Sequence, residues 1–557
     1  MPDARVANTI TGRSAFLAVL KDEGITKMFG NPGTTELPIM HALTEQSDVG
    51  YVLGLQEAIV IAMADGYARA SGKLVSCNVH VAPGLGNAIG AIYTAHVSGT
   101  PMIVTAGQQE QGHGLTEPLL YAPLVPIAQP VVKWATEVTR IEDLPRILRR
   151  AAKIAMTAPT GPVFISLPGD ILNNEAALDL GEATRVDTAV RPSDQALEKL
   201  ARRLLAARNP VILAGHEIAT SDAFNEAAAL ATTLGAPVYQ QTVGYGAHFP
   251  SEHPAFITAL GRDQKAVRAA LADYDFMFCV GSDVLKMSVW SDVEPLPPGL
   301  KVGMLGLRDW EMGKNFPAEI ALRADVKETL AALVPLLQRL GGEALATRAK
   351  ASLAALAPRN WSTRRAKRRA ETVPRAVETP LPAEWVMMRL SERLPADAVI
   401  VDEGITSSNA LLSHFAFRDR NAFFGNVSGG IGWGIAAAVG VQVALPERRV
   451  VATIGDGSAM YSIQAIWTAA HLKLPTIFLI ANNGGYQILK NRLKAYHGND
   501  RPIGMDFKDP SIDASQIARG FGLPAERVDS AEGFDAALTR ALARTDGPSL
   551  IEVMVRS

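Results

Sequence analysis

Residues 455–486 read "GDGSAMYSIQAIWTAAHLKLPTIFLIANNGGY". The apolar run before this stretch predicts a strand that ends near Ile454, and "TIFLIA" predicts a second strand that ends at Asn482 and Asn483. A helical segment lies between the two strands. Neighbouring parallel strands end at the same edge of a sheet, so we expect Asp456 and Asn483 to meet there. The glycines on both sides of Asp456 allow a tight turn and a close approach of the backbone to a ligand.

This pair of side chains predicts a cation site. One carboxylate and one amide oxygen are too few for a cage made of protein alone. They suit Mg²⁺ (or Ca²⁺), which takes its remaining oxygens from water, a backbone carbonyl and ligand phosphates. The helix that follows the turn directs its N-terminus toward such an anion. A lone Gly-Asp-Gly is equally consistent with a surface turn, but the second strand and the paired asparagines make the pattern specific.

The composition of the chain argues against several classes of protein. The chain has 557 residues, of which 48% are hydrophobic and 20% charged, and its formal net charge is −2. That balance argues against nucleic-acid binding, which usually brings a basic excess. Two cysteines cannot form a disulfide framework, and we expect a reducing, cytoplasmic location. The N-terminus has no secretory signal, and the longest weakly polar stretch, residues 431–445, is too short to span a membrane.

The fold class follows from recurring short apolar runs, each followed by a glycine turn and an alanine-rich segment. Examples are "KLVSCNVH", "PVILAG" and "RRVVATIGDG". This alternation predicts doubly wound α/β domains with parallel sheets. Polar residues 174–193 and the segment 340–383 read as linkers. They divide the chain into domains at residues 1–180, 190–345 and 375–557.

Two further features concern this organisation. The basic run "RRAKRR" (364–369) could dock an anion, but a solvated connector helix is the favoured interpretation. The segments "AIYTAHVSGTPMIVTAG" (91–107) and "AIWTAAHLKLPTIFLIA" (465–481) share a helix, a proline and a strand in one register. Coincidence between alanine-rich helices is the alternative. The match predicts that the first and third domains share one fold.

Taken together, residues 455–486 resemble the cofactor motif of thiamine-diphosphate-dependent enzymes, which opens with Gly-Asp-Gly and closes with Asn-Asn. The resemblance implies a magnesium ion held by Asp456, Asn483 and the carbonyl of Gly485. It also implies cofactor contacts from Gly455, Gly457 and Ser458. The bound group would be a diphosphate bridged to the metal.

Such enzymes need a carboxylate far from the diphosphate, against N1′ of the aminopyrimidine, where a buried carboxyl can share a proton. Glu57 in "YVLGLQEAIVIAMADGYARASG" (51–72) fits this role because it opens a helix that is apolar enough to be buried. A glutamate at a helix start can also simply serve the helix dipole. Beside the Gly-Asp-Gly motif, the catalytic interpretation is favoured.

The resemblance extends over nearly the whole chain and is closest to the benzoylformate decarboxylases. "MFGNPGTTELPIM" (28–40) and "NVHVAPGLGNAIGA" (78–91) carry it alongside the motifs above. It implies pyrimidine-binding, middle and diphosphate-binding domains, with active sites between subunits of a dimer or tetramer. By position, His80 is implied to handle protons, Thr34 to hold the substrate carboxylate, Gly33 and Asn87 to contact the cofactor, and Ile431 to support the thiazolium ring. For His80 and Ile431 a structural role is the alternative.

Departures from the family cluster where the substrate should lie. Ser288 occupies the position of a second catalytic histidine, and a serine cannot relay protons near neutral pH as imidazole does. Gly425 and Arg492 replace phenylalanines. Arg492 could bind an anionic group or lie on the surface. Ile488 and Leu489 are expected to line the same pocket.

Three functions are compatible with these residues. The first is decarboxylation of a small 2-oxo acid, benzoylformate-like, to an aldehyde. The second is a carboligase of the acetolactate-synthase type that passes the acyl unit to a second carbonyl. The third is a non-catalytic cofactor-binding protein, which the retention of Glu57, His80, Asp456 and Asn483 disfavours.

Overall fold

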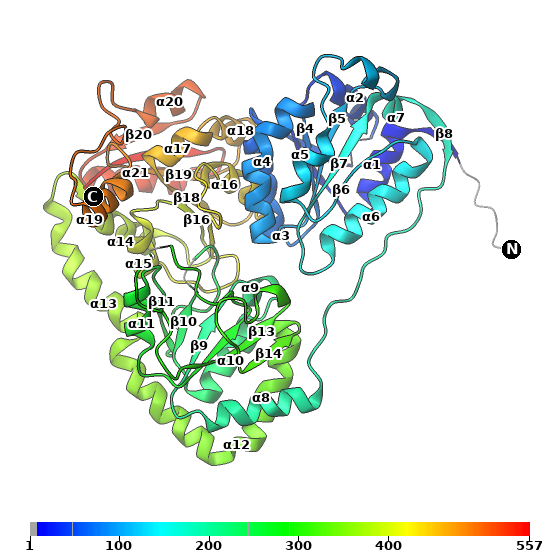
Figure 1. Cartoon of the computed structure of the whole chain (residues 1–557). Helices are drawn as coiled ribbons and strands as arrows, with labels where there is room; N and C mark the ends of the chain where they lie inside the picture. The colour runs from blue at the N-terminus through cyan, green and yellow to red at the C-terminus, as the bar shows by residue number, and fades with distance from the viewer. Residues whose placement is uncertain (1–7, 47, 242–243, 289, 557) are drawn as a thin grey trace.

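The computed structural model describes residues 8–46, 48–241, 244–288 and 290–556. Three large parallel sheets form three α/β domains (Figure 1), and a two-stranded antiparallel sheet joins β1 (Asn8–Thr11) to β8 (Glu175–Leu178). The predicted fold class is confirmed. One detail differs, because the predicted linker 174–193 begins with strand β8 before it becomes the exposed segment that leads to the middle domain.

The first domain has the strand order β3-β2-β4-β5-β7-β6. Its strands are β2 (Lys27–Gly30), β3 (Gly50–Leu53), β4 (Val75–Val79), β5 (Met102–Gln108), β6 (Ala135–Glu137) and β7 (Pro162–Pro168). Its helices are α1 (Gly12–Asp22), α2 (Leu37–Glu45), α3 (Glu57–Ser71), α4 (Val81–Ser98), α5 (Leu124–Ala128), α6 (Leu144–Met156) and α7 (Gly169–Asn173). Helices α1 and α6 pack in one hydrophobic cluster with the sheet and α3 and α4 in another, so both faces of the sheet are covered.

The third domain has the order β15-β21-β19-β18-β16-β17, with β20 also paired to β21. Its strands are β15 (Leu381–Pro382), β16 (Val399–Glu403), β17 (Phe423–Gly425), β18 (Val450–Gly455), β19 (Ile477–Asn482), β20 (Ala525–Val528) and β21 (Ser549–Arg556). Its helices are α14 (Ala383–Arg393), α15 (Ser408–His414), α16 (Gly434–Ala444), α17 (Asp456–Ser462), α18 (Ala465–His471), α19 (Gln487–His497), α20 (Ala514–Gly520) and α21 (Ala531–Ala543).

The first and third domains share one topology. Counted along the chain from β2 and from β16, both sheets have the strand order 2-1-3-4-6-5, and β15 is an addition at the edge of the third. The two similar sequence segments occupy equivalent places, since α4 leads to β5 and α18 leads to β19. The predicted duplication is therefore confirmed.

The middle domain has the order β11-β10-β9-β12-β13-β14. Its strands are β9 (Pro210–Ala214), β10 (Val238–Gln240), β11 (Phe256–Ala259), β12 (Phe276–Val280), β13 (Lys301–Gly306) and β14 (Ile320–Arg323). Its helices are α8 (Asp194–Ala206), α9 (Glu217–Thr220), α10 (Phe224–Leu234), α11 (Gln264–Leu271) and α12 (Val326–Leu356). The basic run lies on α13 (Trp361–Thr372), a largely exposed connector helix, as expected.

The crevice between β9 and β12, where such sheets usually bind ligands, is packed in this domain. A Cβ at Gly215 would overlap the backbone of Gly281, so the two turns touch. Glu217 is buried beside them, and its Oε2 accepts the Leu307 N–H at 2.8 Å. Burial raises the pKa of Glu217 to about 7. The residue therefore has a structural role here.

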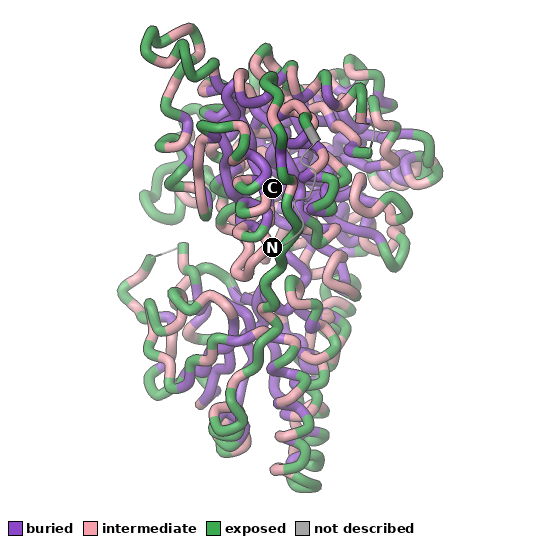
Figure 2. The backbone as a smooth tube through the Cα atoms, turned by 90° about the vertical axis from the view of Figure 1, so that its right-hand side faces the viewer, coloured by how far each residue is buried: buried purple, intermediate pink, exposed green. Residues whose placement is uncertain are grey.

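The first and third domains are joined through α3 and α16. A single hydrophobic cluster runs across both helices, whereas the middle domain has its own core. Figure 2 shows buried residues gathered in an upper and a lower body, with the exposed linker passing from one to the other in front. Among the described residues, no helix is both long and apolar enough to cross a membrane.

Candidate active site

The carboxyl edge of β18 and β19 brings together the two residues that the sequence singled out. Gly455 pairs with Ala481 in parallel register, so Asp456 and Asn483 follow neighbouring strand ends. Asp456 begins α17 and its carboxylate accepts three backbone N–H groups, from Gly457 at 2.8 Å, Gly484 at 2.8 Å and Gly485 at 3.0 Å. The loop that carries Asn483 is thus folded around Asp456. Burial raises the pKa of this carboxyl, and the N–H groups oppose that shift.

The two adjacent asparagines differ in their partners. Asn482 is buried, and its Nδ2 donates to Glu552 Oε1 at 2.6 Å. Its Oδ1 accepts the Gly484 N–H at 2.9 Å. Asn483 Oδ1 is also buried, but no hydrogen-bond partner reaches it. Asn482 therefore supports the turn, and Asn483 presents an unused oxygen.

These residues fit a magnesium diphosphate. An orphaned buried oxygen costs free energy unless a ligand or water fills it. Asn483 carries such an oxygen on the loop whose Gly484 and Gly485 N–H groups bind the Asp456 carboxylate, and a carboxylate favours a nearby cation. Among the described residues, no group of three or more His, Cys, Asp and Glu side chains could hold a metal ion alone. A cation here must therefore draw on amide, carbonyl and phosphate oxygens. A Cβ at Gly457 would lie 2.5 Å from the Tyr486 ring, so the turn requires glycine, and Ser458 is buried in the same turn.

Glu57 lies in the first domain at the first position of α3. Gln56 caps this helix by accepting the N–H groups of Ala58 and Ile59. Glu57 is only 7% exposed, and Asn87 Nδ2 donates to its Oε2 at 3.0 Å. A Cβ at Gly84 would lie 2.9 Å from its Oε1, so the first turn of α4 approaches the carboxylate closely. The predicted residues Glu57, which is buried, and Asn87, which is exposed, are therefore joined by a hydrogen bond.

His80 precedes α4 and is held by a residue that sequence reasoning missed. Its Nδ1 lies 2.8 Å from Oε2 of Glu36, which is fully buried. Glu36 also accepts the N–H groups of Gly33 at 2.9 Å and Gly107 at 2.8 Å, and the hydroxyl of Thr35. A Cβ at Gly33 would overlap the His80 ring. The signal for Glu36 is its place three residues after Gly33, in a turn whose first N–H it accepts.

The remaining predicted residues are less constrained. Thr34 is exposed at the start of a short 3₁₀ turn, and Ile431 is half-buried in the loop before α16. Ser288 is exposed in the loop after β12. Gly425 is buried, and a side chain has little room there, since a Cβ would lie 3.0 Å from the Gly244 carbonyl oxygen. Their assignment to substrate or cofactor stays a prediction.

Three of the predicted pocket residues lie on α19, which buries none of its residues. Leu489 is 45% exposed, and Ile488 and Arg492 are half-buried. Gly485 precedes this helix, and its carbonyl accepts the Gln487 N–H at 3.0 Å. An apolar helix face left open beside the Asp456 turn is consistent with a pocket wall.

Within one chain, Glu57 and Asp456 belong to different domains, at the first positions of α3 and α17. Trp433, just before α16, donates from Nε1 to Asp65 Oδ2 at 2.6 Å. Asp65 lies eight positions after Glu57 on α3, which corresponds to about 12 Å along the helix axis. Helix α16 then runs back along α3, since Gly66 meets Ala437 and Met63 meets Gly440. The two helices therefore pack antiparallel, and each chain carries Glu57 and Asp456 on different domains, as two half-sites.

Comparison with known proteins agrees with this geometry. Three family models match, namely the N-terminal TPP binding domain of thiamine pyrophosphate enzymes over residues 10–118, their central domain over 197–333 and their C-terminal TPP binding domain over 404–553. A benzoylformate decarboxylase from Pseudomonas aeruginosa is 33% identical over 551 residues, which cover 98% of each chain. An acetolactate synthase large subunit from Haemophilus influenzae is 27% identical over 481 residues, which cover 85% of this chain and 82% of that protein.

A solved structure gives the same result. The thiamine diphosphate-dependent 4-hydroxybenzoylformate decarboxylase from Rhodococcus jostii RHA1 superposes with a TM-score of 0.87 at 31% identity. The match covers 98% of this chain and 99% of that one. With all three domain models matched in order along the chain, this protein belongs to the thiamine pyrophosphate enzymes.

Proposed function

We propose that the protein decarboxylates a benzoylformate-like 2-oxo acid to an aldehyde, using thiamine diphosphate and Mg²⁺. The observation that carries the proposal is the coexistence of two built half-sites, the orphaned Asn483 oxygen beside Asp456 and the buried Glu57 beside Asn87. The similarity to two aryl 2-oxo acid decarboxylases along nearly the whole chain supports the substrate class.

Each residue has a distinct task in this proposal. Asp456, Asn483 and the Gly485 carbonyl would hold the metal, and Gly455, Gly457 and Ser458 would surround the diphosphate. Gly33 and Ile431 would contact the pyrimidine and thiazolium rings. When bound, thiamine diphosphate supplies an electron-accepting ring for cleavage of the bond to the carboxylate.

The protein's own groups manage protons and orientation. Glu57 would exchange a proton with N1′ of the pyrimidine, in a location from which burial excludes water. His80 Nδ1 lies 2.8 Å from the Glu36 carboxyl. An ionised carboxylate only accepts, so this contact favours the Nδ1–H tautomer and would leave Nε2 as the nitrogen available for proton transfer. Thr34 would hold the substrate carboxylate through its hydroxyl. Ile488, Leu489, Arg492 and Gly425 would bound the acyl group.

The first test is CO₂ release from benzoylformate by cofactor-free protein, with and without added thiamine diphosphate and Mg²⁺. Release that depends on both additions is the expected result. No release from a protein shown to bind the cofactor would refute an aryl substrate.

A second candidate function is carboligation. Ser288 is exposed on its loop and offers no ring nitrogen for proton transfer, so an acyl unit could persist until a second carbonyl arrives. Similarity to an acetolactate synthase points the same way. Adding an acceptor aldehyde and measuring the hydroxyketone against free aldehyde distinguishes the two functions.

The placement of the two half-sites on different domains leads to a proposal about assembly. A complete site would combine Glu57 of one chain with Asp456 of a second copy, in a dimer or a tetramer. We expect that mixing equal amounts of Glu57→Gln and Asp456→Ala chains restores about a quarter of the wild-type sites after subunit exchange. About half of the dimers are then mixed, and each mixed dimer has one intact site of two. Sites contained within single chains would show no recovery.

A further inference from the structure

The loop that carries Ile431 is held mainly by polar contacts. This glycine-rich loop, residues 426–433, joins β17 to α16, and most of it is half-buried or exposed. Gly429 and Gly432 have φ values of 80° and 102°, which favour glycine. Trp433 at the end of the loop is buried in the hydrophobic core, whereas residues 426–432 are half-buried or exposed, so hydrogen bonds have a large part in fixing their conformation.

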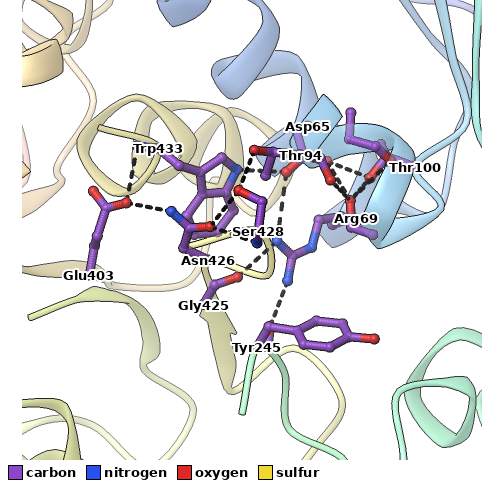
Figure 3. Close-up of polar contacts among 12 residues, drawn as sticks. Asp65, Arg69, Thr94, Thr100, Tyr245, Glu403, Gly425, Asn426, Ser428 and Trp433 are labelled. Atoms are coloured by element: carbon purple, nitrogen blue, oxygen red, sulfur yellow. Dashed lines mark hydrogen bonds and ion pairs between the residues drawn. The ribbon is translucent and has the colours of Figure 1, made fainter. Parts of the chain in front are cut away.

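The main anchor is Glu403, the last residue of β16, which is 2% exposed. Its Oε1 accepts Asn426 Nδ2 at 2.7 Å and the Trp433 N–H at 3.2 Å. Its Oε2 accepts the N–H groups of Gly432 at 3.0 Å and Gly434 at 3.1 Å. One carboxylate thus binds both ends of the loop and the first turn of α16 (Figure 3). Burial raises the pKa of Glu403 to about 7, against the effect of these four donors.

Asn426, which Glu403 binds, makes further hydrogen bonds within the loop. Its Oδ1 accepts the N–H groups of Ser428 at 3.0 Å and Gly429 at 3.3 Å, and its Nδ2 also donates to the Gly430 carbonyl. The loop therefore closes on the side chain that Glu403 holds.

The opposite side of the loop is attached to the first domain. Ser428 Oγ lies 2.8 Å from Thr94 Oγ1 on α4, and Trp433 Nε1 donates to Asp65 on α3. Asp65 is fully buried and also accepts the Thr100 hydroxyl. Arg69 donates to the carbonyls of Gly425 at 3.1 Å and Tyr245 at 2.6 Å, which brings in the middle domain. Figure 3 shows these contacts converging on the loop.

We propose that Glu403 is a positioning residue that holds the glycine-rich loop in the conformation in which Ile431 supports the cofactor. The inference rests on the proposed function for what Ile431 contacts. That Glu403 holds the loop is independent of the proposed function, because all of these contacts are within the protein. A loop held before binding loses little conformational entropy when the cofactor arrives, so Glu403 acts on cofactor affinity.

The test compares Glu403→Gln with Glu217→Gln. A glutamine at 403 offers one acceptor oxygen and places an NH₂ group against N–H donors, so the loop should loosen. Glu217→Gln is the matched control, because that glutamate is also buried, has a pKa raised to about 7 like that of Glu403 and lies in the middle domain. Hydrogen exchange of amides 426–434 in cofactor-free protein is the direct readout, with the amides of β18 as an internal reference for global opening.

For Glu403→Gln we expect faster exchange confined to 426–434. We also expect about 10- to 100-fold weaker binding of thiamine diphosphate, the ratio that corresponds to a lost hydrogen bond to a charged group. Glu217→Gln should change neither. Asn426→Ala, which removes one partner and leaves the buried carboxylate in place, should reproduce the local exchange if Glu403→Gln does not fold.

The outcomes separate this inference from the proposed function. Unchanged exchange at 426–434 in both loop variants, with normal cofactor binding, would overturn the role of Glu403. Faster exchange throughout β18 as well would show a general structural role instead. Wild-type protein that fails to bind thiamine diphosphate would refute the proposed function and not the role of Glu403 in the loop.

Discussion

Glutamine in place of Glu57 is expected to lower kcat/KM for the 2-oxo acid by about 10²- to 10⁴-fold, the range typical of lost general acid–base catalysis. Glutamine keeps the size of the side chain and can still accept from Asn87, so the local packing should survive. It cannot exchange a proton. Cofactor affinity, measured by quenching of intrinsic tryptophan fluorescence, should therefore change much less than turnover.

The control for this variant is again Glu217→Gln, since Glu217 is a buried glutamate at the first position of a helix, as Glu57 is. We expect it to leave kcat/KM unchanged. Full turnover by Glu57→Gln would show that the Glu57 carboxyl is not catalytic. Absence of turnover in wild-type protein that binds the cofactor would favour the third hypothesis, a non-catalytic cofactor-binding protein.

The second large effect is expected at the paired asparagines, where substitution of Asn483 should affect cofactor binding and substitution of Asn482 should affect stability. Asn483→Ala should weaken Mg²⁺-dependent cofactor binding by about 10- to 100-fold, if its oxygen contributes as much as a hydrogen bond to a charged group. Because that oxygen has no partner within the protein, the stability of cofactor-free protein should scarcely change. Titration with Mg²⁺ at saturating thiamine diphosphate measures the first effect.

Asn482→Ala should act on stability instead. It leaves Glu552, which is fully buried, without the donor at 2.6 Å, although the Ser515 N–H at 3.1 Å remains. An unsatisfied buried group of this kind costs about 1–3 kcal/mol. Chemical denaturation of the cofactor-free protein detects that loss. Equal effects of the two substitutions on stability would contradict the division of roles between the asparagines.

Much of the fold could be predicted because it depends on local patterns. Apolar runs that end in glycine turns marked the strands of all three sheets, and the shared Ala-Ile-aromatic-Thr-Ala segments revealed that two domains have one topology. The error at 174–193 has a simple cause. Strand β8 is only four residues long, and its partner β1 lies at the other end of the first domain, at Asn8–Thr11.

The candidate site divides in the same way. Asp456 and Asn483 directly follow two consecutive strands, so the rule that neighbouring parallel strands end at one edge was sufficient to predict that they lie together. Glu36 and His80 lie 44 positions apart on different elements, and Glu403 binds a loop about 30 positions later. No periodic pattern in the sequence predicts either of these contacts.

The sequence by itself determined the three α/β domains, their duplication, the pairing of Asp456 with Asn483 and the burial of Glu57. Hydrophobic periodicity and the direction of parallel strands act over short stretches of chain and are written in consecutive residues. Only the tertiary structure decided which asparagine keeps an unused oxygen, which carboxylate holds His80 and which holds the glycine-rich loop. It also decided that α3 and α16 pack against each other across the first and third domains. Those outcomes depend on packing between distant segments, where each buried polar group must find its partner in three dimensions.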